Sequence, residues 1–254
     1  MRKVITFMSV ASLSLVLMLS GCGTKAVPTS TGEKPPAVNT QANQPSGAAT
    51  AVYKRTEVIT SPDVAKTLLD DGNTRFTSGK TLSKDISAAR RMELEKNGQH
   101  PFAVIVSCSD SRVPPEVLYD EALGDLFVIR VAGNVITPVE LGSVEYAVEH
   151  LKTPLVVVLG HEKCGAVTAA VQGGEIPGSI GSIVTKIQPA IDKAKSSGAT
   201  GDDLIEKSTD LNVQNAIQDI MKSPIVKHAV ETKETKLLGA KYDLDTGVSK
   251  WYTE

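Results

Sequence analysis

Five residues with chemically reactive side chains lie in two short runs near the middle of the chain. Cys108, Asp110 and Arg112 belong to the run CSDSR, and His161 and Cys164 belong to the run GHEKC. Two thiolates and one imidazole are a ligand set for zinc, and three protein ligands leave a fourth position for water or substrate. These residue types predict a metal site of the catalytic kind.

Each run directly follows a stretch of apolar, largely β-branched residues. Residues 102–106 read FAVIV and lead to Cys108, and residues 155–159 read LVVVL and lead to His161. Such stretches, bounded by proline or glycine, are typical of buried strands in a parallel sheet. Because α/β sheets place their sites at the carboxyl ends of the strands, two such strands would bring Cys108, His161 and Cys164 together.

The cysteine count leaves one alternative to a metal site. The chain has three cysteines, and Cys22 lies in an N-terminal targeting segment. Cys108 and Cys164 are then the thiols of the folded part, and they could form a disulfide. A disulfide would leave the neighbouring His161 without a role, so metal binding is the favoured interpretation.

Composition places the chain among soluble globular proteins with a targeting segment. Its 254 residues suffice for one substantial domain with appendages. Hydrophobic residues make up 41% and charged residues 22%, which are ordinary values. The net charge of -2 and the lack of a basic stripe give no indication of a nucleic-acid partner.

The N-terminus has the pattern of a signal peptide. Arg2 and Lys3 are followed by an apolar stretch over residues 4–19, which suits a signal peptide better than a spanning helix. The run LSGC that ends at Cys22 resembles a bacterial lipobox, which implies removal of residues 1–21 and lipid on Cys22. We therefore expect a lipid-anchored protein of the cell envelope that faces the periplasm or the cell exterior. The alternative is an ordinary secretory signal with a chance cysteine.

A tether separates this segment from the folded domain. Residues 22–55 contain four prolines among small and polar residues and show no apolar periodicity, so we predict a disordered, lipid-anchored linker. The folded domain is predicted over residues 56–254.

Within the domain, strands alternate with helices. This order predicts an α/β fold with a central, mainly parallel sheet flanked by helices, and with a helical arm before the first strand. Besides the two strands above, we expect a strand at 126–129 and a closing hairpin of residues 237–244 and 248–252. Helices are expected from Ser61 onward and at 87–96, 137–151, 165–171, 182–194 and 202–221, with a short helical turn from Pro114.

Several motifs together resemble those of the β-class carbonic anhydrases. The pattern Cys-x-Asp-x-Arg followed by His-x-x-Cys on a second strand is specific to that family, whereas each half alone is weak. Further matching runs are DGNTRF at 71–76, GDLFVIRVAGN at 124–134, GSVEYA at 142–147 and GAKYDL at 239–244. The resemblance extends from about Ser61 to the C-terminus.

The resemblance implies reversible hydration of carbon dioxide to bicarbonate and a proton. It implies one zinc ion per chain, held by Cys108, His161 and Cys164, with water or hydroxide in the fourth position. Asp110 would accept the hydrogen bond of that water, and Arg112 would keep Asp110 ionised through a charge-assisted pair. In some family members the same aspartate binds zinc in place of water, which makes Asp110 a fourth metal ligand in a closed form. Without the resemblance, Asp110 and Arg112 would be a surface ion pair.

Three further positions match residues that line the carbon dioxide pocket of the permanently open, plant-like members. Gln99 would donate to a bicarbonate oxygen, and Phe127 and Tyr146 would form an apolar wall. The resemblance also implies a homodimer or homotetramer in which residues such as Gln99 reach the site across the subunit boundary. Without it, Gln99 is a loop residue, Phe127 a core residue and Tyr146 a helix-face residue.

Two other functions remain open at this point. The same scaffold could hydrolyse carbonyl sulfide or carbon disulfide, whose linear shape resembles that of carbon dioxide, and pocket width would discriminate between these substrates. A non-enzymatic zinc-binding lipoprotein is the third possibility. Arg112 and Gln99 argue against it, because metal storage requires neither residue.

Overall fold

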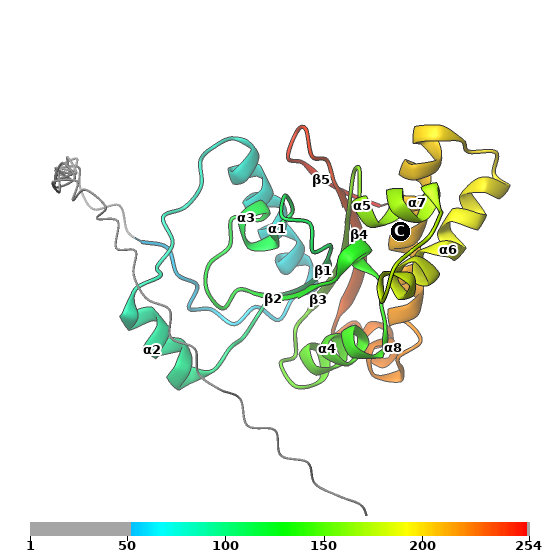
Figure 1. Ribbon diagram of the computed structural model, residues 1–254. Helices are drawn as coiled ribbons and strands as arrows, with labels where there is room; N and C mark the ends of the chain where they lie inside the picture. Colours follow the sequence, from blue (N-terminus) through cyan, green and yellow to red (C-terminus); the bar gives the residue numbers. More distant parts are fainter. Residues whose placement is uncertain (1–51, 253–254) are drawn as a thin grey trace, which may run out of the picture. The chain divides into compact units, whose positions relative to one another are not determined.

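The structure is a computed structural model that describes residues 52–252 (Figure 1). The predicted signal peptide over residues 1–21, the lipidation site Cys22 and the tether up to residue 51 lie outside the described residues. Within the described part, none of the helices is both long enough and apolar enough to span a membrane.

A five-stranded sheet forms the centre of the domain. Its strand order is β2-β1-β3-β4-β5, in which the first four strands are parallel and β5 is antiparallel to β4. The predicted α/β class with a mainly parallel sheet is therefore confirmed. The strands are β1 (Ala103–Ser107), β2 (Leu126–Arg130), β3 (Leu155–His161), β4 (Lys236–Tyr242) and β5 (Ser249–Trp251).

Helices connect the strands and cover both faces of the sheet. Two of them, α1 and α2, precede the first strand as predicted, and Figure 1 shows α2 set apart from the sheet. One helix, α8, was not predicted from the sequence. The helices are α1 (Pro62–Thr77), α2 (Ala88–Asn97), α3 (Pro115–Leu118), α4 (Pro138–Glu149), α5 (Gly165–Gln172), α6 (Ile180–Ser196), α7 (Gly201–Ile220) and α8 (Pro224–Glu231), with a 3-10 turn, η1, at Ala132–Asn134.

Side chains of the buried strands alternate between two apolar cores. Ala103 and Ile105 of β1 belong to one core, which also contains Cys108 and is covered by α1, α5 and α6. Val104 and Val106 point to the other core, which is covered by α4, α7 and α8. Because successive side chains of a strand point to opposite faces, a fully apolar strand is what a sheet covered on both faces requires.

Capping chemistry begins the helices where the sequence indicated. Ser61 caps α1 by accepting a hydrogen bond from the Val64 N–H, and Pro62 occupies the first turn. At α4 the Thr137 hydroxyl and the Glu140 carboxylate form a capping box that satisfies two backbone donors reciprocally. These caps fix where each helix leaves the loop before it.

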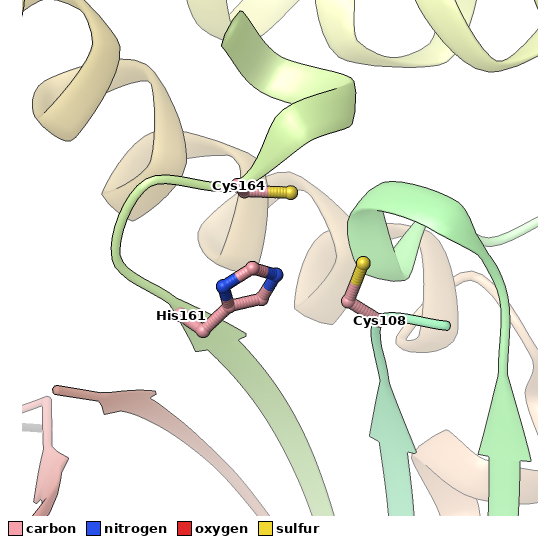
Figure 2. A group of neighbouring side chains, drawn as sticks. All are labelled: Cys108, His161 and Cys164. Atoms are coloured by element: carbon pink, nitrogen blue, oxygen red, sulfur yellow. The ribbon is translucent and has the colours of Figure 1, made fainter. Parts of the chain in front are cut away.

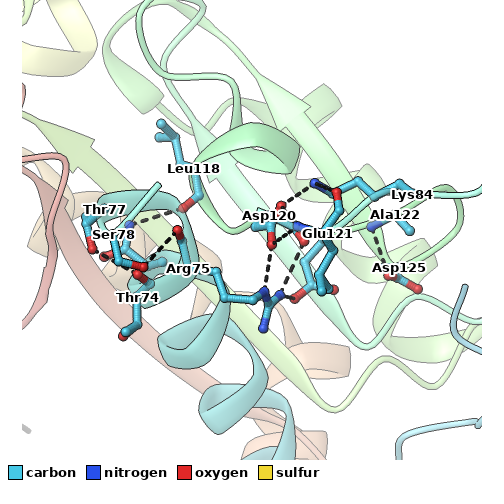
Figure 3. Close-up of polar contacts among 12 residues, drawn as sticks. Thr74, Arg75, Thr77, Ser78, Lys84, Leu118, Asp120, Glu121, Ala122 and Asp125 are labelled. Carbon is cyan, nitrogen blue, oxygen red and sulfur yellow. Dashed lines mark hydrogen bonds and ion pairs between the residues drawn. The ribbon is translucent and has the colours of Figure 1, made fainter. Parts of the chain in front are cut away.

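A cluster of buried charges anchors the loop between α3 and β2. Arg75 of α1 forms ion pairs with Asp120, at 2.6 Å, and with Glu121, and Lys84 also pairs with Asp120 (Figure 3). The carboxylates of Asp120 and Glu121 are fully buried. Removing one partner of a buried ion pair leaves an uncompensated charge and costs about 3–5 kcal/mol. The cluster thus fixes the segment between α3 and β2, which follows the loop that carries Asp110.

The first described residues contact the folded domain. The backbone of Tyr53 forms a bridge with Lys84, and Arg55 pairs with Glu121 at 3.1 Å and with Asp125 at 3.5 Å. Tyr53 and Arg55 stand at the end of the segment predicted as a tether. In the structure they join the charged cluster instead of extending away from it.

A substitution at Gly72 tests the packing of α1. A Cβ at Gly72 would lie 1.8 Å from the Tyr119 carbonyl oxygen, whereas a Cβ at Gly142 of α4 would meet no heavy atom within 4 Å outside its own helix backbone. We expect Gly72→Ala to lower the free energy of unfolding by about 3 kcal/mol or more, because the backbone of the α3–β2 loop must move. Gly142→Ala is the control, and it should stabilise α4 by up to about 1 kcal/mol. Thermal unfolding measures both, and equal melting temperatures for the two variants would contradict the packing described.

Candidate metal centre

The register of two neighbouring strands places the first two donors side by side. Ser107 at the end of β1 pairs with Leu159 of β3. Cys108 follows Ser107 directly, and His161 is the last residue of β3. Cys164, three residues further on, is the N-cap residue of α5, so the turn after β3 returns a second thiol to the same place.

The three donor side chains face one another. Figure 2 shows Cys108, His161 and Cys164 arriving from the end of β1, the end of β3 and the start of α5. Their ligand atoms all lie within 4.8 Å of one another. The residues are almost completely buried, with exposed fractions of 4%, 0% and 1%.

The histidine presents one nitrogen toward the two sulfurs. Its Nδ1 lies 2.8 Å from the Glu162 carbonyl oxygen, which can only accept, so Nδ1 carries the proton. The Nε2 atom is buried and has no hydrogen-bond partner. A metal-binding histidine commonly donates its other N–H to a carbonyl or carboxylate, and this arrangement leaves Nε2 free as a ligand. The other histidines, His100, His150 and His228, are exposed.

Both cysteines are free thiols in the structure, so the disulfide alternative is not realised. Hydrogen bonds from the Cys164 thiol and the Gly133 N–H lower the pKa of Cys108 to about 4. The pKa of Cys164 is raised, because it shares a proton with Cys108 and is buried. One thiolate at neutral pH, a second thiol and an unpartnered imidazole nitrogen fit Zn²⁺, whose binding displaces the remaining proton.

Asp110 and Arg112 form an ion pair at the edge of this group. The Nε atom of Arg112 donates to Oδ1 of Asp110 at 2.9 Å, and Nη2 donates to Oδ2 at 2.7 Å. This two-pronged contact lowers the pKa of Asp110 to about 2, so the carboxylate is ionised at neutral pH. Asp110 Oδ2 lies 3.9 Å from Nε2 of His161, which places the pair directly beside the donors.

Arg130 is a site residue to which the sequence analysis gave no role. At the end of β2, it donates from Nε to the Cys108 carbonyl at 3.0 Å and from Nη2 to the Asp110 carbonyl at 2.6 Å. These contacts fix the backbone of the loop that carries both residues. Arg130 lies within the matching run at 124–134, but a positive charge at a strand end does not reveal its partner.

Solved structures of β-carbonic anhydrases resemble this fold. A Coccomyxa β-carbonic anhydrase in complex with acetazolamide has a TM-score of 0.59 and 29% identity, covering 66% of this chain and 78% of that one. A tetrameric β-carbonic anhydrase of Sordaria macrospora has a TM-score of 0.59 and 25% identity, covering 66% and 92%.

Sequence relatives agree with the structural likeness. The family model described as carbonic anhydrase matches residues 103–249. The chain is 39% identical to a carbonic anhydrase of Mycolicibacterium smegmatis over 192 residues, covering 74% of this chain and 91% of the relative. The chain belongs to the β-carbonic anhydrase family. Carbonic anhydrase 2 of Mycobacterium tuberculosis is 37% identical over 193 residues, with the same coverage. The family predicted from the motifs is thus confirmed, and the protein is an enzyme of the carbonic anhydrase class.

The pocket residues predicted for this carbonic anhydrase do not meet the donors of their own chain. Gln99 is exposed in the loop before β1, whereas Cys108 follows the other end of that strand. Phe127 packs against the core on the opposite face of the sheet from Cys108. Tyr146 lies with its ring centroid 6.2 Å from that of Phe127 and is 46% exposed. Gln99, Phe127 and Tyr146 therefore require a second chain if they are to line the site.

Metal content tests the donor group. We expect the purified protein to hold one zinc per chain, and Cys108→Ser or His161→Ala to reduce the zinc content to near zero, because two remaining ligands cannot hold the ion. His228→Ala is the control, since His228 is an exposed histidine of α8 and should have no effect. Elemental analysis of dialysed protein gives the number of zinc ions per chain. Full zinc content in His161→Ala would contradict the assignment.

Proposed function

We propose that the protein catalyses the reversible hydration of carbon dioxide with a zinc ion held by Cys108, His161 and Cys164. The observation that carries the proposal is the buried group of these three donors with the ionised pair of Asp110 and Arg112 at its edge. Carbonic anhydrase membership supports carbon dioxide as the substrate. It does not support hydrolysis of carbonyl sulfide or carbon disulfide, nor metal storage without catalysis.

Zinc bound there would act as a Lewis acid that makes a coordinated water acidic near neutral pH. Asp110, whose Oδ2 lies 3.9 Å from Nε2 of His161, would accept a hydrogen bond from that water and orient its oxygen. Arg112 keeps Asp110 anionic and holds both of its carboxylate oxygens. The guanidinium fork suits this task because its planar donors match a carboxylate in two places.

The pairing of Asp110 favours the open form of the site. Arg112 binds both carboxylate oxygens, and the backbone N–H of Arg112 donates to Oδ1 at 2.9 Å. Asp110 would have to give up these contacts before it could bind zinc as a fourth ligand. We therefore propose that Asp110 remains with Arg112 and leaves the fourth position to water.

Replacement of Asp110 separates metal binding from catalysis. We expect Asp110→Asn to retain zinc and to lose about 10²–10³-fold in kcat, because an amide of the same shape carries no charge to orient the attacking oxygen. Asp245→Asn is the control, because Asp245 is exposed and lines the cleft of about 980 Å³ beside Arg112. Stopped-flow hydration of carbon dioxide measures both variants. Unchanged hydration in Asp110→Asn would show that the pair has no part in the reaction.

We also propose that the active unit is a homodimer or a homotetramer. The β-carbonic anhydrases of Sordaria macrospora are described as tetrameric. In one chain of this protein the pocket residues lie away from the donors, and the α4 surface that carries Tyr146 also exposes Val139, at 76%. Apolar side chains exposed beside an incomplete pocket are consistent with a surface that a second copy covers.

Co-expression of two inactive variants tests a shared site. A chain with Gln99→Ala keeps its donors and Asp110, and a chain with Asp110→Asn keeps Gln99. If Gln99 serves the partner's site, random pairing restores one site in each mixed dimer, or about a quarter of wild-type activity. The control is a mixture of the two variants that were expressed separately and do not exchange subunits during the assay. Activity no higher than in that control would place Gln99 in the site of its own chain or in no site.

We propose that the enzyme acts at the cell envelope, anchored by lipid on Cys22. The support is the sequence pattern of a charged start, an apolar core and the run LSGC. Two or three acyl chains would give stable membrane attachment. The domain would then work in the periplasm or at the cell exterior.

Mutation of the lipobox cysteine tests this location. We expect the mature protein to have 233 residues, since 254 minus 21 remain after cleavage, and to partition with membranes. Cys22→Ala should leave the precursor uncleaved or release the protein, because the acceptor sulfur is missing. Ser20→Ala is a neighbouring control that keeps the cysteine. Unmodified wild-type protein in the soluble fraction, shown by mass spectrometry, would contradict the anchor.

A further inference from the structure

A backbone N–H of the turn η1 points at one of the donor sulfurs. The Gly133 N–H donates to Sγ of Cys108 at 3.3 Å, and both atoms are buried. Gly133 has φ 71 and ψ 18, a left-handed conformation that favours glycine. A Cβ there would also lie 2.9 Å from Cδ1 of Ile187 and 3.2 Å from Cβ of Ala166. The position therefore brings backbone close to the sulfur in a way that a larger residue cannot.

A side chain from a distant helix holds this glycine. Asn212 of α7 is buried, with 2% exposed, and its Nδ2 donates to the Gly133 carbonyl at 2.7 Å across 79 residues of sequence. Thr209 lies one turn earlier on α7 and is equally buried. Its hydroxyl donates a hydrogen bond to the Ile205 carbonyl of the same helix. A buried amide without a partner is costly, so the bond from Asn212 fixes the turn against α7.

We propose that Asn212 is a positioning residue for the metal centre, which acts through Gly133 to keep an N–H on Sγ of Cys108. This inference rests on the proposed function, because it requires Cys108 to be a zinc ligand. An N–H bond to a metal thiolate directs the sulfur and withdraws part of its negative charge. Asn212 thereby controls the affinity of Cys108 for the metal and the negative charge on its sulfur. It lies outside the motifs that identify the family.

Two kinds of measurement on the full chain test the proposal. Zinc affinity is measured by competition with a chromophoric chelator, and the thiolate-to-metal charge-transfer band is recorded after substitution with Co²⁺. In Asn212→Leu, which is similar in size but has no donor, we expect zinc binding to weaken about 10–100-fold. The charge-transfer band should shift to lower energy, because the sulfur loses a hydrogen bond and becomes more electron-rich.

Thr209→Val is the matched control. It removes a buried hydroxyl from the same helix, one turn away, whose hydrogen bond goes to the Ile205 carbonyl and not to η1. We expect its zinc affinity to stay within about two-fold of wild type and its cobalt band to be unchanged, since only a bond within α7 is lost. If Asn212→Leu yields no folded protein, the same measurements are made on Asn212→Ala, which removes the same donor without adding an apolar branch.

The outcomes separate this inference from the proposed function. If the wild-type protein shows no thiolate-to-cobalt band, Cys108 and Cys164 do not bind the metal and the proposed function itself fails. If wild type shows the band and Asn212→Leu matches it in zinc affinity and band position, Asn212 has no positioning role. A drop in melting temperature with unchanged affinity and spectrum also overturns the proposal, because it assigns Asn212 to stability alone.

Discussion

The parallel pairing of β1 with β3 is the constraint on which the rest of the site depends. In that register the end of β1 lies beside the end of β3, so Cys108 and His161 emerge next to each other at one edge of the sheet. The turn that leads into α5 then adds Cys164. A shift of one residue would turn every side chain of a strand to the other face. Because both faces are buried under helices, the two apolar cores fix the register and with it the distance between the donors.

The sequence predicted those parts of the fold and site whose signals are local. β-branched apolar runs identified β1 and β3, and cap residues identified the starts of α1 and α4. The donors were recognisable because Cys-x-Asp-x-Arg and His-x-x-Cys are unusual combinations of reactive side chains. The confirmed family and fold class follow from these signals. Helix α8 was missed although Ser223 and Pro224 provide a cap and a first-turn proline, because its apolar face spans only eight residues.

Contacts between distant segments could not be predicted in this way. Asn212 is one polar residue among many in a 20-residue helix, and nothing near it in sequence indicates that it binds Gly133. Arg130 and Glu121 are similar cases, because the sequence around a charged residue in a strand end or loop does not indicate which residue it will contact. The roles of Gln99, Phe127 and Tyr146 remain predictions, because a single chain keeps them apart from the donors. Under the proposed assembly, one chain would supply the metal and the ion pair, and its partner would supply the pocket wall.

We propose that one zinc ion is bound by two sulfurs and one imidazole nitrogen, with the fourth position left to water. X-ray absorption at the zinc edge of the purified protein measures this most directly. We expect two sulfur neighbours at about 2.3 Å and two nitrogen or oxygen neighbours at about 2.0–2.1 Å, with the multiple-scattering pattern of a single imidazole. A zinc shell without sulfur, or one with two imidazoles, would contradict it.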